Sequence, residues 1–155
     1  KGSVNMNPKK VELFTDGACK NNPGAGGWAS ILRYKGREKE LFGGEKETTN
    51  NRMELTAVIE GLKALKEPCR VVLYTDSKYV ADGLSKGWAA SWREKGWKKQ
   101  DSSPALNPDL WEKLLSLTEK HTLEICWIKG HAGHPENERC DSLAREQINK
   151  VENGK

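Results

Sequence analysis

The hydrophobic pattern of this chain changes its period once, near residue 50, and this change restricts the possible folds more than any other feature. Before it, short apolar runs alternate with charged or glycine-rich turns such as Lys35-Gly36-Arg37. After it, apolar residues recur at helical spacing until Pro68. The pattern predicts strands at Lys10–Thr15, Trp28–Tyr34 and Glu38–Gly43. It then predicts a helix with the apolar stripe Leu55, Val58, Ile59, Leu62 and Leu65.

Helices and strands alternate in the rest of the chain. Thr48 or Thr49 can cap the first helix, and Pro135 suits the first turn of the last one. The order β-β-β-α-β-α-α-α-β-α predicts an α/β fold. We expect a single five-stranded mixed β-sheet, with three antiparallel strands plus two parallel ones and helices on both faces. The later elements are expected at Arg70–Thr75, Lys78–Leu84, Pro108–Lys120, Leu123–Lys129 and Pro135–Lys150.

The chain length of 155 residues favours a single domain. We expect a disordered N-terminal segment at residues 1–9, a folded domain at residues 10–150 and a disordered tail at residues 151–155. No apolar run is long enough for a membrane span and no secretory signal is visible, so we expect a cytoplasmic protein. Four cysteines without paired spacing favour reduced thiols over disulfides.

Two apolar runs of the sequence end in Thr-Asp, in "FTDGAC" and "LYTDSKYV". Asp16 and Asp76 therefore follow predicted strands, and sites in such sheets collect at the carboxyl ends of strands. Either residue alone fits an ordinary turn or cap. Their shared place at one edge of the predicted sheet is what favours a functional site.

Two further carboxylates lie at the margins of apolar helix faces. At about 100° per residue, Glu54 lies about 75° from the centre of the first helix's apolar stripe, whereas Glu60 lies about 165° away and faces water. In the last helix, Asp141 lies roughly 85° from the centre of the stripe. Either carboxylate alone fits an exposed surface acid. Both can nevertheless reach the edge of the sheet where Asp16 and Asp76 are expected.

A cluster of four carboxylates needs cations. The charges repel one another, and partial burial raises the cost of their ionised forms. A set of oxygen ligands suits Mg²⁺ or Mn²⁺. Two such ions, about 3.5–4 Å apart, can activate a water and stabilise a leaving oxygen in a displacement at phosphorus.

A zinc site is the alternative metal hypothesis, because two cysteines and two histidines fall within a short segment near the C-terminus. Their spacing matches no common zinc motif, and the cysteines fit small buried residues on a strand and a helix. We therefore disfavour zinc ligation by Cys126, His131, His134 and Cys140.

Four motifs of the sequence resemble those of the type 1 ribonucleases H, and closely those of the bacterial ones. They are "FTDGAC", "TTNNRMEL", "YTDS" and "WIKGHAGHPENERCD", and the resemblance extends from about Val11 to Gln147. It implies the ribonuclease H-like fold and an endonuclease that hydrolyses the RNA strand of RNA–DNA hybrids. It also implies two Mg²⁺ ions, for which Mn²⁺ can substitute, and products with 5′-phosphate and 3′-hydroxyl ends.

The resemblance assigns the metal-ligand roles of the family to the same four carboxylates. Asp16 would bridge the two ions, and Glu54 and Asp76 would hold the ion beside the leaving oxygen. Asp141 would complete the site of the ion that carries the attacking water. His131 matches the histidine of a mobile loop and would assist proton movement or product release.

The other two histidines carry no expected catalytic role. His121 is expected to be exposed to solvent without a function. His134 is expected to have a structural role at the start of the last helix.

The resemblance also implies the residues that contact the substrate. Discrimination between RNA and DNA requires contacts to the 2′-hydroxyl, which donates and accepts hydrogen bonds. The matching positions are Cys19, Asn22, Asn50 and Asn51, although the asparagines also fit turn and cap roles. Thr49 and Asn107 match positions that hold a phosphate of the DNA strand. The glycines at 24–27 are interpreted as a hairpin connection rather than a phosphate-binding loop.

A basic, tryptophan-rich segment at residues 85–100 has five basic residues and one acidic residue, so it carries a formal charge of +4. The resemblance identifies it as the family's basic protrusion, which contacts phosphates of the DNA strand. Lys98 and Lys99 would contact phosphates, and Trp88 and Trp92 would line the substrate channel. The alternative is that the two tryptophans, four residues apart on a helix, belong to the core.

Two positions depart from the pattern of close bacterial relatives. Glu47 stands where they carry an arginine beside the phosphate pocket, and its negative charge should weaken phosphate binding. Lys78 replaces a glutamine that faces the substrate, and it can add a phosphate contact. Neither residue is an expected metal ligand, so activity should survive.

Two other classes of function remain open: a non-catalytic module that binds hybrids, and a recombination nuclease that acts on DNA. A pure binding module has no need for four repelling acids. The recombination nucleases lack "TTNNRMEL" and the basic segment. We expect the RNA–DNA hybrid as the partner, with no membrane, no required protein partner and a monomeric state.

Overall fold

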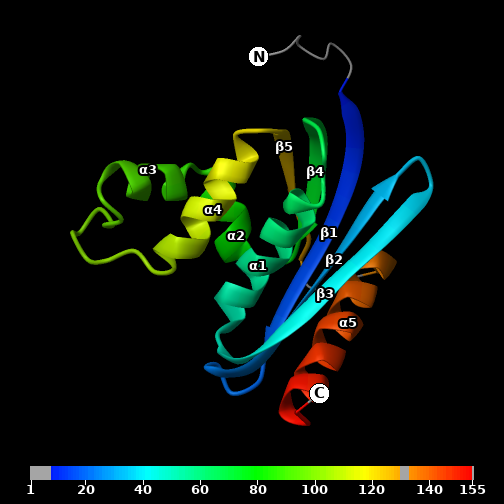
Figure 1. The fold of residues 1–155 in the computed structure, drawn as a ribbon. Helices are drawn as coiled ribbons and strands as arrows, with labels where there is room; N and C mark the ends of the chain where they lie inside the picture. Colours follow the sequence, from blue (N-terminus) through cyan, green and yellow to red (C-terminus); the bar gives the residue numbers. More distant parts are fainter. Residues whose placement is uncertain (1–7, 130–132, 155) are drawn as a thin grey trace.

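A computed structural model describes residues 8–129 and 133–154 of the chain. One five-stranded sheet with strand order β3-β2-β1-β4-β5 forms its centre (Figure 1). Strand β2 pairs antiparallel with both β1 and β3. Strand β4 pairs parallel with both β1 and β5. This topology confirms the predicted mixed sheet. The strands are β1 (Lys9–Cys19), β2 (Gly24–Tyr34), β3 (Arg37–Thr48), β4 (Cys69–Thr75) and β5 (Thr122–Trp127).

The two faces of the sheet bury separate apolar clusters, because successive side chains of a strand point to opposite faces. Leu13 faces a large cluster that includes Leu55 and Trp111. Phe14, the next residue, faces a smaller cluster that includes Cys140 and Ala144. Among the described residues, the larger cluster includes side chains of α1 (Asn50–Lys63), α2 (Lys78–Ser85), α3 (Trp88–Glu94) and α4 (Pro108–Thr118). The smaller cluster includes side chains of α5 (Pro135–Glu152).

The predicted helix starts agree with the observed ones. Thr49, one of the two candidates, is the N-cap of α1, and its hydroxyl accepts a hydrogen bond from the backbone N–H of Arg52 at 3.2 Å. Proline stands in the first turn of both α4 and α5, where its missing N–H has no intrahelical partner.

The glycine-rich segment was placed wrongly by the sequence interpretation. Residues 24–27 begin strand β2 itself, and the connection from β1 lies before them. Gly26 and Gly27 pair with Cys19 and Ala18 of β1. A Cβ on Gly27 would collide with the backbone carbonyl of Ala144, so the glycine lets α5 approach the sheet closely.

Both ends of the folded part extend beyond the expected limits. Lys9 pairs with Cys69 at the start of β1, and its ammonium lies 2.7 Å from the carboxylate of Glu67. At the other end, α5 continues through Val151 to Glu152. Val151 lies against Gly44 of β3, a contact between distant segments that the polar sequence alone did not predict. Within the described residues, no helix is both long and apolar enough for a membrane span.

His121 has a structural contact, so the expectation of an exposed side chain without a role was wrong. Its Nδ1 accepts a hydrogen bond from the backbone N–H of Cys69 at 3.0 Å. This bond satisfies the first N–H of β4. Burial, with a smaller effect from the nearby Lys120, lowers the pKa of His121.

Acid should weaken this contact, since a protonated Nδ1 cannot accept a hydrogen bond. A histidine with a lowered pKa in the folded state binds its proton more weakly there than in the unfolded chain. The contribution of the His121 hydrogen bond to folding stability is therefore complete above the ordinary histidine pKa of about 6.5. This contribution is lost as the pH falls below that value. We expect His121→Gln, whose carbonyl accepts without titrating, to lose less stability than the wild type on acidification. Urea unfolding on both sides of this pKa measures the difference. Equal losses in the two proteins would contradict the assignment.

Candidate functional site

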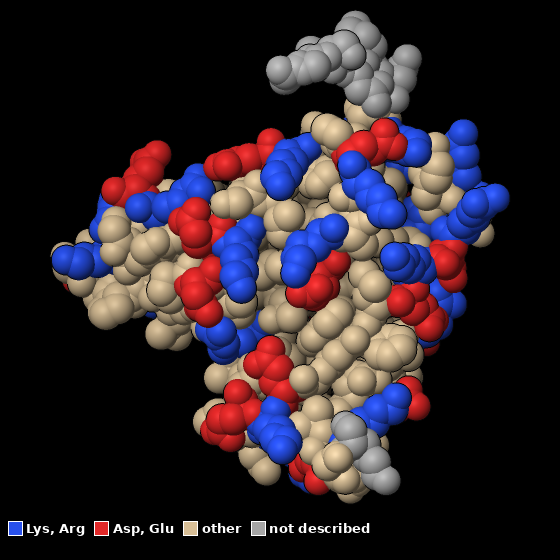
Figure 2. All heavy atoms as spheres, in the orientation of Figure 1, with Lys and Arg blue, Asp and Glu red and all other residues tan. Residues whose placement is uncertain are grey.

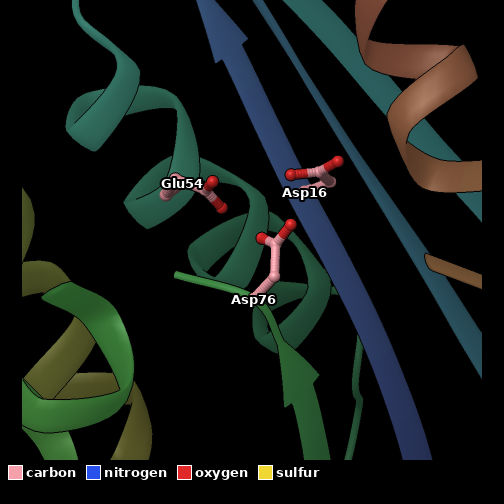
Figure 3. A group of neighbouring side chains, drawn as sticks. All are labelled: Asp16, Glu54 and Asp76. Carbon is pink, nitrogen blue, oxygen red and sulfur yellow. The ribbon is translucent and has the colours of Figure 1, made fainter. Parts of the chain in front are cut away.

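Three carboxylates from distant parts of the chain meet at one edge of the sheet (Figure 3). Oxygen atoms of Asp16, Glu54 and Asp76 all lie within 4.8 Å of one another. Asp16 is on β1, Glu54 is on α1 and Asp76 follows β4. The structure thus brings together three of the four acids that the sequence analysis selected.

The strand pairing explains why two of these acids are close. The parallel register of β1 and β4 ends at Phe14 and Tyr74. Asp16 and Asp76 both lie two residues beyond this last pair, at the carboxyl end of the two parallel strands. Ligand sites of α/β sheets form at this end.

A glycine explains why the third acid is close. A Cβ on Gly17 would lie 2.5 Å from the backbone N of Glu54, which is closer than real Cβ contacts. The missing side chain therefore lets α1 pack directly on β1, so that Glu54 lies beside Asp16.

Burial makes this cluster electrostatically unfavourable without a cation. Asp16 is 3% exposed and Glu54 is 5% exposed. Burial, reinforced by the charges of Asp76 and Asp141, raises the pKa of Asp16 to about 8. Burial and the charge of Asp16 raise the pKa of Glu54 well above its usual range. Each shift means that the ionised form is disfavoured in the folded protein.

Two oxygens of the cluster lack a hydrogen-bond partner within the described residues. They are Oδ2 of Asp16 and Oε1 of Glu54, and both are buried. The other oxygen of Asp16 accepts a hydrogen bond from the backbone N–H of Gly17 at 2.9 Å. Buried carboxylate oxygens without donors are suitable ligands for a hard divalent cation such as Mg²⁺.

Asp141 lies at the margin of the same site. It lines a cavity of about 720 Å³ together with Asp16, Glu54 and Asp76. Its two oxygens lie 3.1 and 3.0 Å from Nε of Arg145, one turn later on α5. It is outside the group of three acids whose oxygens lie within 4.8 Å of one another. All four selected carboxylates therefore line one cavity, but only three are in close mutual contact.

The alternative zinc residues do not form a comparable group within the described part of the chain. Cys140 is fully buried, and its thiol donates to the backbone carbonyl of Phe14 at 3.4 Å. Cys126 is half-buried on β5. His131 lies outside the described residues, so the structure does not address its expected role.

A second cavity, of about 590 Å³, gathers most of the expected substrate contacts. Its lining includes six of the expected residues and Leu106, which the sequence analysis missed. The exposure of Leu106, at 64%, is a property that only the structure reveals. The six expected residues are Cys19, Asn22, Thr49, Asn50, Asn51 and Asn107.

Several of these polar side chains also have structural contacts. Asn22 Oδ1 accepts a hydrogen bond from the backbone N–H of Asn50 at 2.9 Å. Asn107 adopts a left-handed conformation with φ 59° before α4, and its Oδ1 accepts from Arg52 at 3.1 Å. Arg52, also missed by the sequence analysis, pairs with Asp109 at 2.8 Å. The asparagines therefore combine turn or cap roles with a position on the cavity wall.

The tryptophan-rich segment projects from the rest of the molecule around α3 (Figure 1). Trp92 packs against the larger core cluster, and Trp88 is 43% exposed beside it. Lys98 and Lys99 are both exposed. On the face drawn in Figure 2, basic and acidic side chains are interspersed. The core interpretation therefore holds for Trp92, and the channel role of Trp88 stays a prediction.

Glu47 and Lys78, the two positions that depart from the pattern of close bacterial relatives, both lie on the surface. Glu47 is exposed near the end of β3. The ammonium of Lys78 lies 3.9 Å from Asp82 and 4.9 Å from the ring centroid of Trp127. The indole N–H of Trp127 donates to the backbone carbonyl of Asp76 at 3.2 Å. No motif in the sequence indicated this contact beside the acidic cluster.

The sequence matches the RNase H family over residues 8–149. The ribonuclease H of Desulforamulus reducens is 59% identical over 140 residues, which cover 90% of this chain and 88% of that protein. The ribonuclease H of Rhizobium johnstonii is 56% identical over 147 residues, which cover 95% of this chain and 97% of that protein.

Solved structures show the same fold. LC9-RNase H1, a type 1 RNase H with the type 2 active-site motif, superposes with a TM-score of 0.83 at 31% identity, covering 94% of this chain and 75% of that chain. LC11-RNase H1, solved in complex with an RNA/DNA hybrid, has a TM-score of 0.60 at 21% identity, with coverage of 91% and 98%.

Proposed function

This chain belongs to the ribonuclease H family as a type 1 member and is an endoribonuclease, and from this premise we propose that it hydrolyses the RNA strand of RNA–DNA hybrids with two divalent cations. The products would carry 5′-phosphate and 3′-hydroxyl ends. The observation that carries the proposal is the close group of Asp16, Glu54 and Asp76, in which the buried Asp16 and Glu54 each have an oxygen that lacks a donor within the described residues.

The proposed metal ligands are the four carboxylates of the 720 Å³ cavity. Asp16 would be shared between the two ions, and Glu54 and Asp76 would hold the ion beside the leaving oxygen. Asp141 would hold the ion beside the attacking water. Bound Mg²⁺ supplies an activated water and stabilises the negative charge that develops on the leaving oxygen. Mn²⁺ has a similar preference for oxygen ligands and would replace it.

Side chains of the protein would orient the phosphate, transfer the proton and position the metal ligands. The carboxylates would hold the cations, and the cations would in turn orient the reacting phosphate. His131 would accept or carry a proton near the scissile phosphate, and this role is a proposal drawn from the family resemblance. Trp127 would help to hold Asp76 through the hydrogen bond to its backbone carbonyl.

The 590 Å³ cavity is the proposed place for recognition of the hybrid's minor groove. Its amide and backbone groups can donate and accept, as discrimination of a 2′-hydroxyl requires. LC11-RNase H1, which shares the fold, holds an RNA/DNA hybrid. We assign the same substrate class to this chain, with Lys78 and the residues Trp88, Trp92, Lys98 and Lys99 along the path of the strands.

Cleavage of end-labelled duplexes tests the proposal. We expect cleavage of the RNA strand of a hybrid in Mg²⁺, none with a chelator, and none of duplex DNA or duplex RNA. Phosphatase treatment and ligation of the products identify the ends. Binding of the hybrid without cleavage would instead indicate a non-catalytic module, and cleavage of duplex DNA would indicate a recombination-type nuclease.

The basic segment yields a separate prediction about salt dependence. If Lys98 and Lys99 each contact a phosphate, Lys98→Ala and Lys99→Ala should each raise KM for the hybrid several-fold with little change in kcat. Each should also reduce the slope of log affinity against log salt by about 1. Lys39→Ala, an exposed lysine on β3, is the matched control. A slope equal to that of the control variant would exclude a phosphate contact at the position tested.

A further inference from the structure

The position of Asp141 has a different structural origin from that of the other three acids. Asp16, Glu54 and Asp76 are held by strand pairing and by the close approach of α1 to β1 at Gly17. Asp141 is on α5, which covers the opposite face of the sheet from α1. Its distance from Asp16 therefore depends on how α5 docks on β1.

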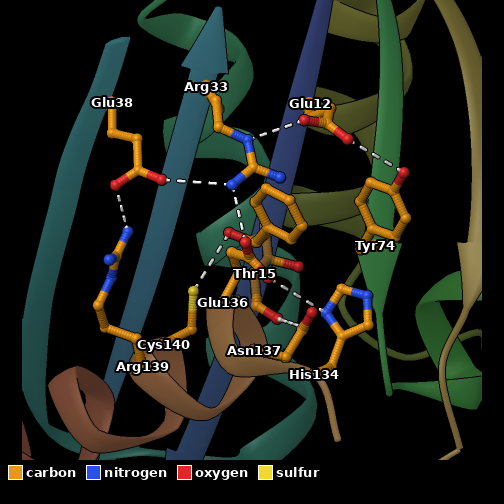
Figure 4. A network of polar contacts seen from close by, with 11 residues as sticks. Glu12, Thr15, Arg33, Glu38, Tyr74, His134, Glu136, Asn137, Arg139 and Cys140 are labelled. Carbon is orange, nitrogen blue, oxygen red and sulfur yellow. Dashed lines mark hydrogen bonds and ion pairs between the residues drawn. The ribbon is translucent and has the colours of Figure 1, made fainter. Parts of the chain in front are cut away.

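Two buried side chains of α5 bond directly to the backbone of β1 (Figure 4). The amide nitrogen of Asn137 donates to the carbonyl of Thr15 at 3.3 Å. The thiol of Cys140 donates to the carbonyl of Phe14 at 3.4 Å. Asn137 is 1% exposed and Cys140 is fully buried. A thiol is a weak donor, so the amide of Asn137 is the stronger of the two bonds.

The Thr15 carbonyl lies at the end of the β1–β4 pairing, beside the acidic site. It precedes Asp16 in the chain, and it lies just beyond Phe14, the last β1 residue in register with β4. The side chain of Asn137 thus satisfies a carbonyl at the place where the β1–β4 register ends. The Oδ1 of Asn137 and the Oγ1 of Thr15 are themselves buried without a partner in the described part of the chain. Loss of a donor among such groups is costly, because no neighbouring group replaces it.

The geometry of α5 links this bond to Asp141. Asn137 and Asp141 are four residues apart, so their side chains lie on adjacent turns of the same helix face. A displacement of the helix at Asn137 would therefore move Asp141 as well. Arg33 of β2 also holds the start of α5, through Glu136 at 2.7 Å. Both side chains of this pair are partly exposed, and Glu136 lies one residue nearer the helix start than Asn137.

We propose that Asn137 is a positioning residue of the acidic site. Its hydrogen bond to the Thr15 carbonyl sets the distance between Asp141 and Asp16, and thereby the affinity for the cation that these two carboxylates share. This inference rests on the proposed function, because it assumes that Asp16 and Asp141 bind divalent cations.

The test compares two isosteric changes on α5. Asn137→Leu keeps the shape of the side chain and removes the donor. Gln147→Met is the matched control, because Gln147 is also a buried amide of α5, 7% exposed, and its Nε2 has no partner in the described part of the chain. Mg²⁺ binding is measured without substrate, by calorimetric titration and by the increase in Tm on adding Mg²⁺. Urea unfolding without metal measures stability.

We expect Asn137→Leu to weaken Mg²⁺ binding by about 10-fold or more, as removal of groups that orient metal ligands does. Gln147→Met should leave Mg²⁺ affinity unchanged, whatever stability it loses. In an Asp141→Asn background, Asn137→Leu should have little further effect on Mg²⁺ affinity, because it acts through Asp141. If Asn137→Leu does not fold, Asn137→Ala removes the donor without adding bulk and takes its place.

Wild-type Mg²⁺ affinity in folded Asn137→Leu would overturn the inference and leave the proposed function intact. An equal loss in the Asp141→Asn background would also overturn it, since Asn137 would then act independently of Asp141. Failure of the wild type to bind Mg²⁺ or to cleave a hybrid would instead contradict the proposed function.

Discussion

Asp16→Asn is expected to abolish cleavage of a hybrid and to make the metal-free protein more stable. The first effect follows from the proposed role of Asp16 as the shared ligand of both cations, since an amide neither carries the charge nor bridges two ions. We expect cleavage to fall by about 1,000-fold or more, comparable to the loss when a central electrostatic group is removed from an active site. Cleavage at the wild-type rate would refute the metal-site assignment.

The gain in stability follows from the electrostatics of the folded state. Burial and the neighbouring carboxylates raise the pKa of Asp16 to about 8. An acid with a raised pKa binds its proton more tightly in the folded than in the unfolded chain. The wild type therefore loses stability as the pH rises from about 4 to about 8. Asparagine does not ionise, so at neutral pH the variant should gain about 2–4 kcal/mol, given about 1.4 kcal/mol for each unit of pKa shift.

Urea unfolding in a chelator, at several pH values, measures this gain. Glu60→Gln is the matched control, because Glu60 is a partly exposed acid on α1 that pairs with Lys63 outside the cluster. It should change neither cleavage nor the pH dependence of stability. An Asp16→Asn variant with the same pH dependence as the wild type would show that Asp16 is not under electrostatic strain.

Gly17→Ala should both destabilise the protein and weaken the metal site. The new Cβ would lie 2.5 Å from the backbone N of Glu54 and 2.5 Å from the backbone C of Met53. Backbone atoms cannot rotate away as a side chain can, so α1 must shift relative to β1. We expect a loss of about 2–3 kcal/mol, as for other overpacked cores. The shift would separate Glu54 from Asp16, and Mg²⁺ affinity should fall by about 10-fold.

Gly61→Ala provides the comparison at the other end of the same interface. The Cβ of that variant would meet the flexible end of Leu13, at 2.6 Å, rather than backbone. Alanine also favours a helix interior by up to about 1 kcal/mol over glycine. The variant should therefore lose less stability than Gly17→Ala and retain Mg²⁺ affinity. Equal loss of Mg²⁺ affinity in both variants would show that the close approach at Gly17 does not place Glu54.

Local patterns predicted the elements of the fold because they depend on neighbours in the chain. The change of period near residue 50 predicted the first strands and α1, and Pro135 predicted the start of α5. The same reasoning misplaced residues 24–27, since glycines are typical of turns. Only the packing of α5 on the sheet shows why Gly27 must lack a side chain within a strand.

The sequence by itself determined the order of the elements and the four acids at strand ends and helix margins, because periodicity and residue type act over a few neighbouring positions. The tertiary structure decided which acids meet. Asp16 and Asp76 are 60 residues apart, and only the register of β1 with β4 and the contact of α1 at Gly17 place their oxygens, with those of Glu54, within 4.8 Å. The tertiary structure also placed Asp141 at the margin of this group and Asn137 against Thr15, because contacts between distant segments leave no periodic pattern in the chain.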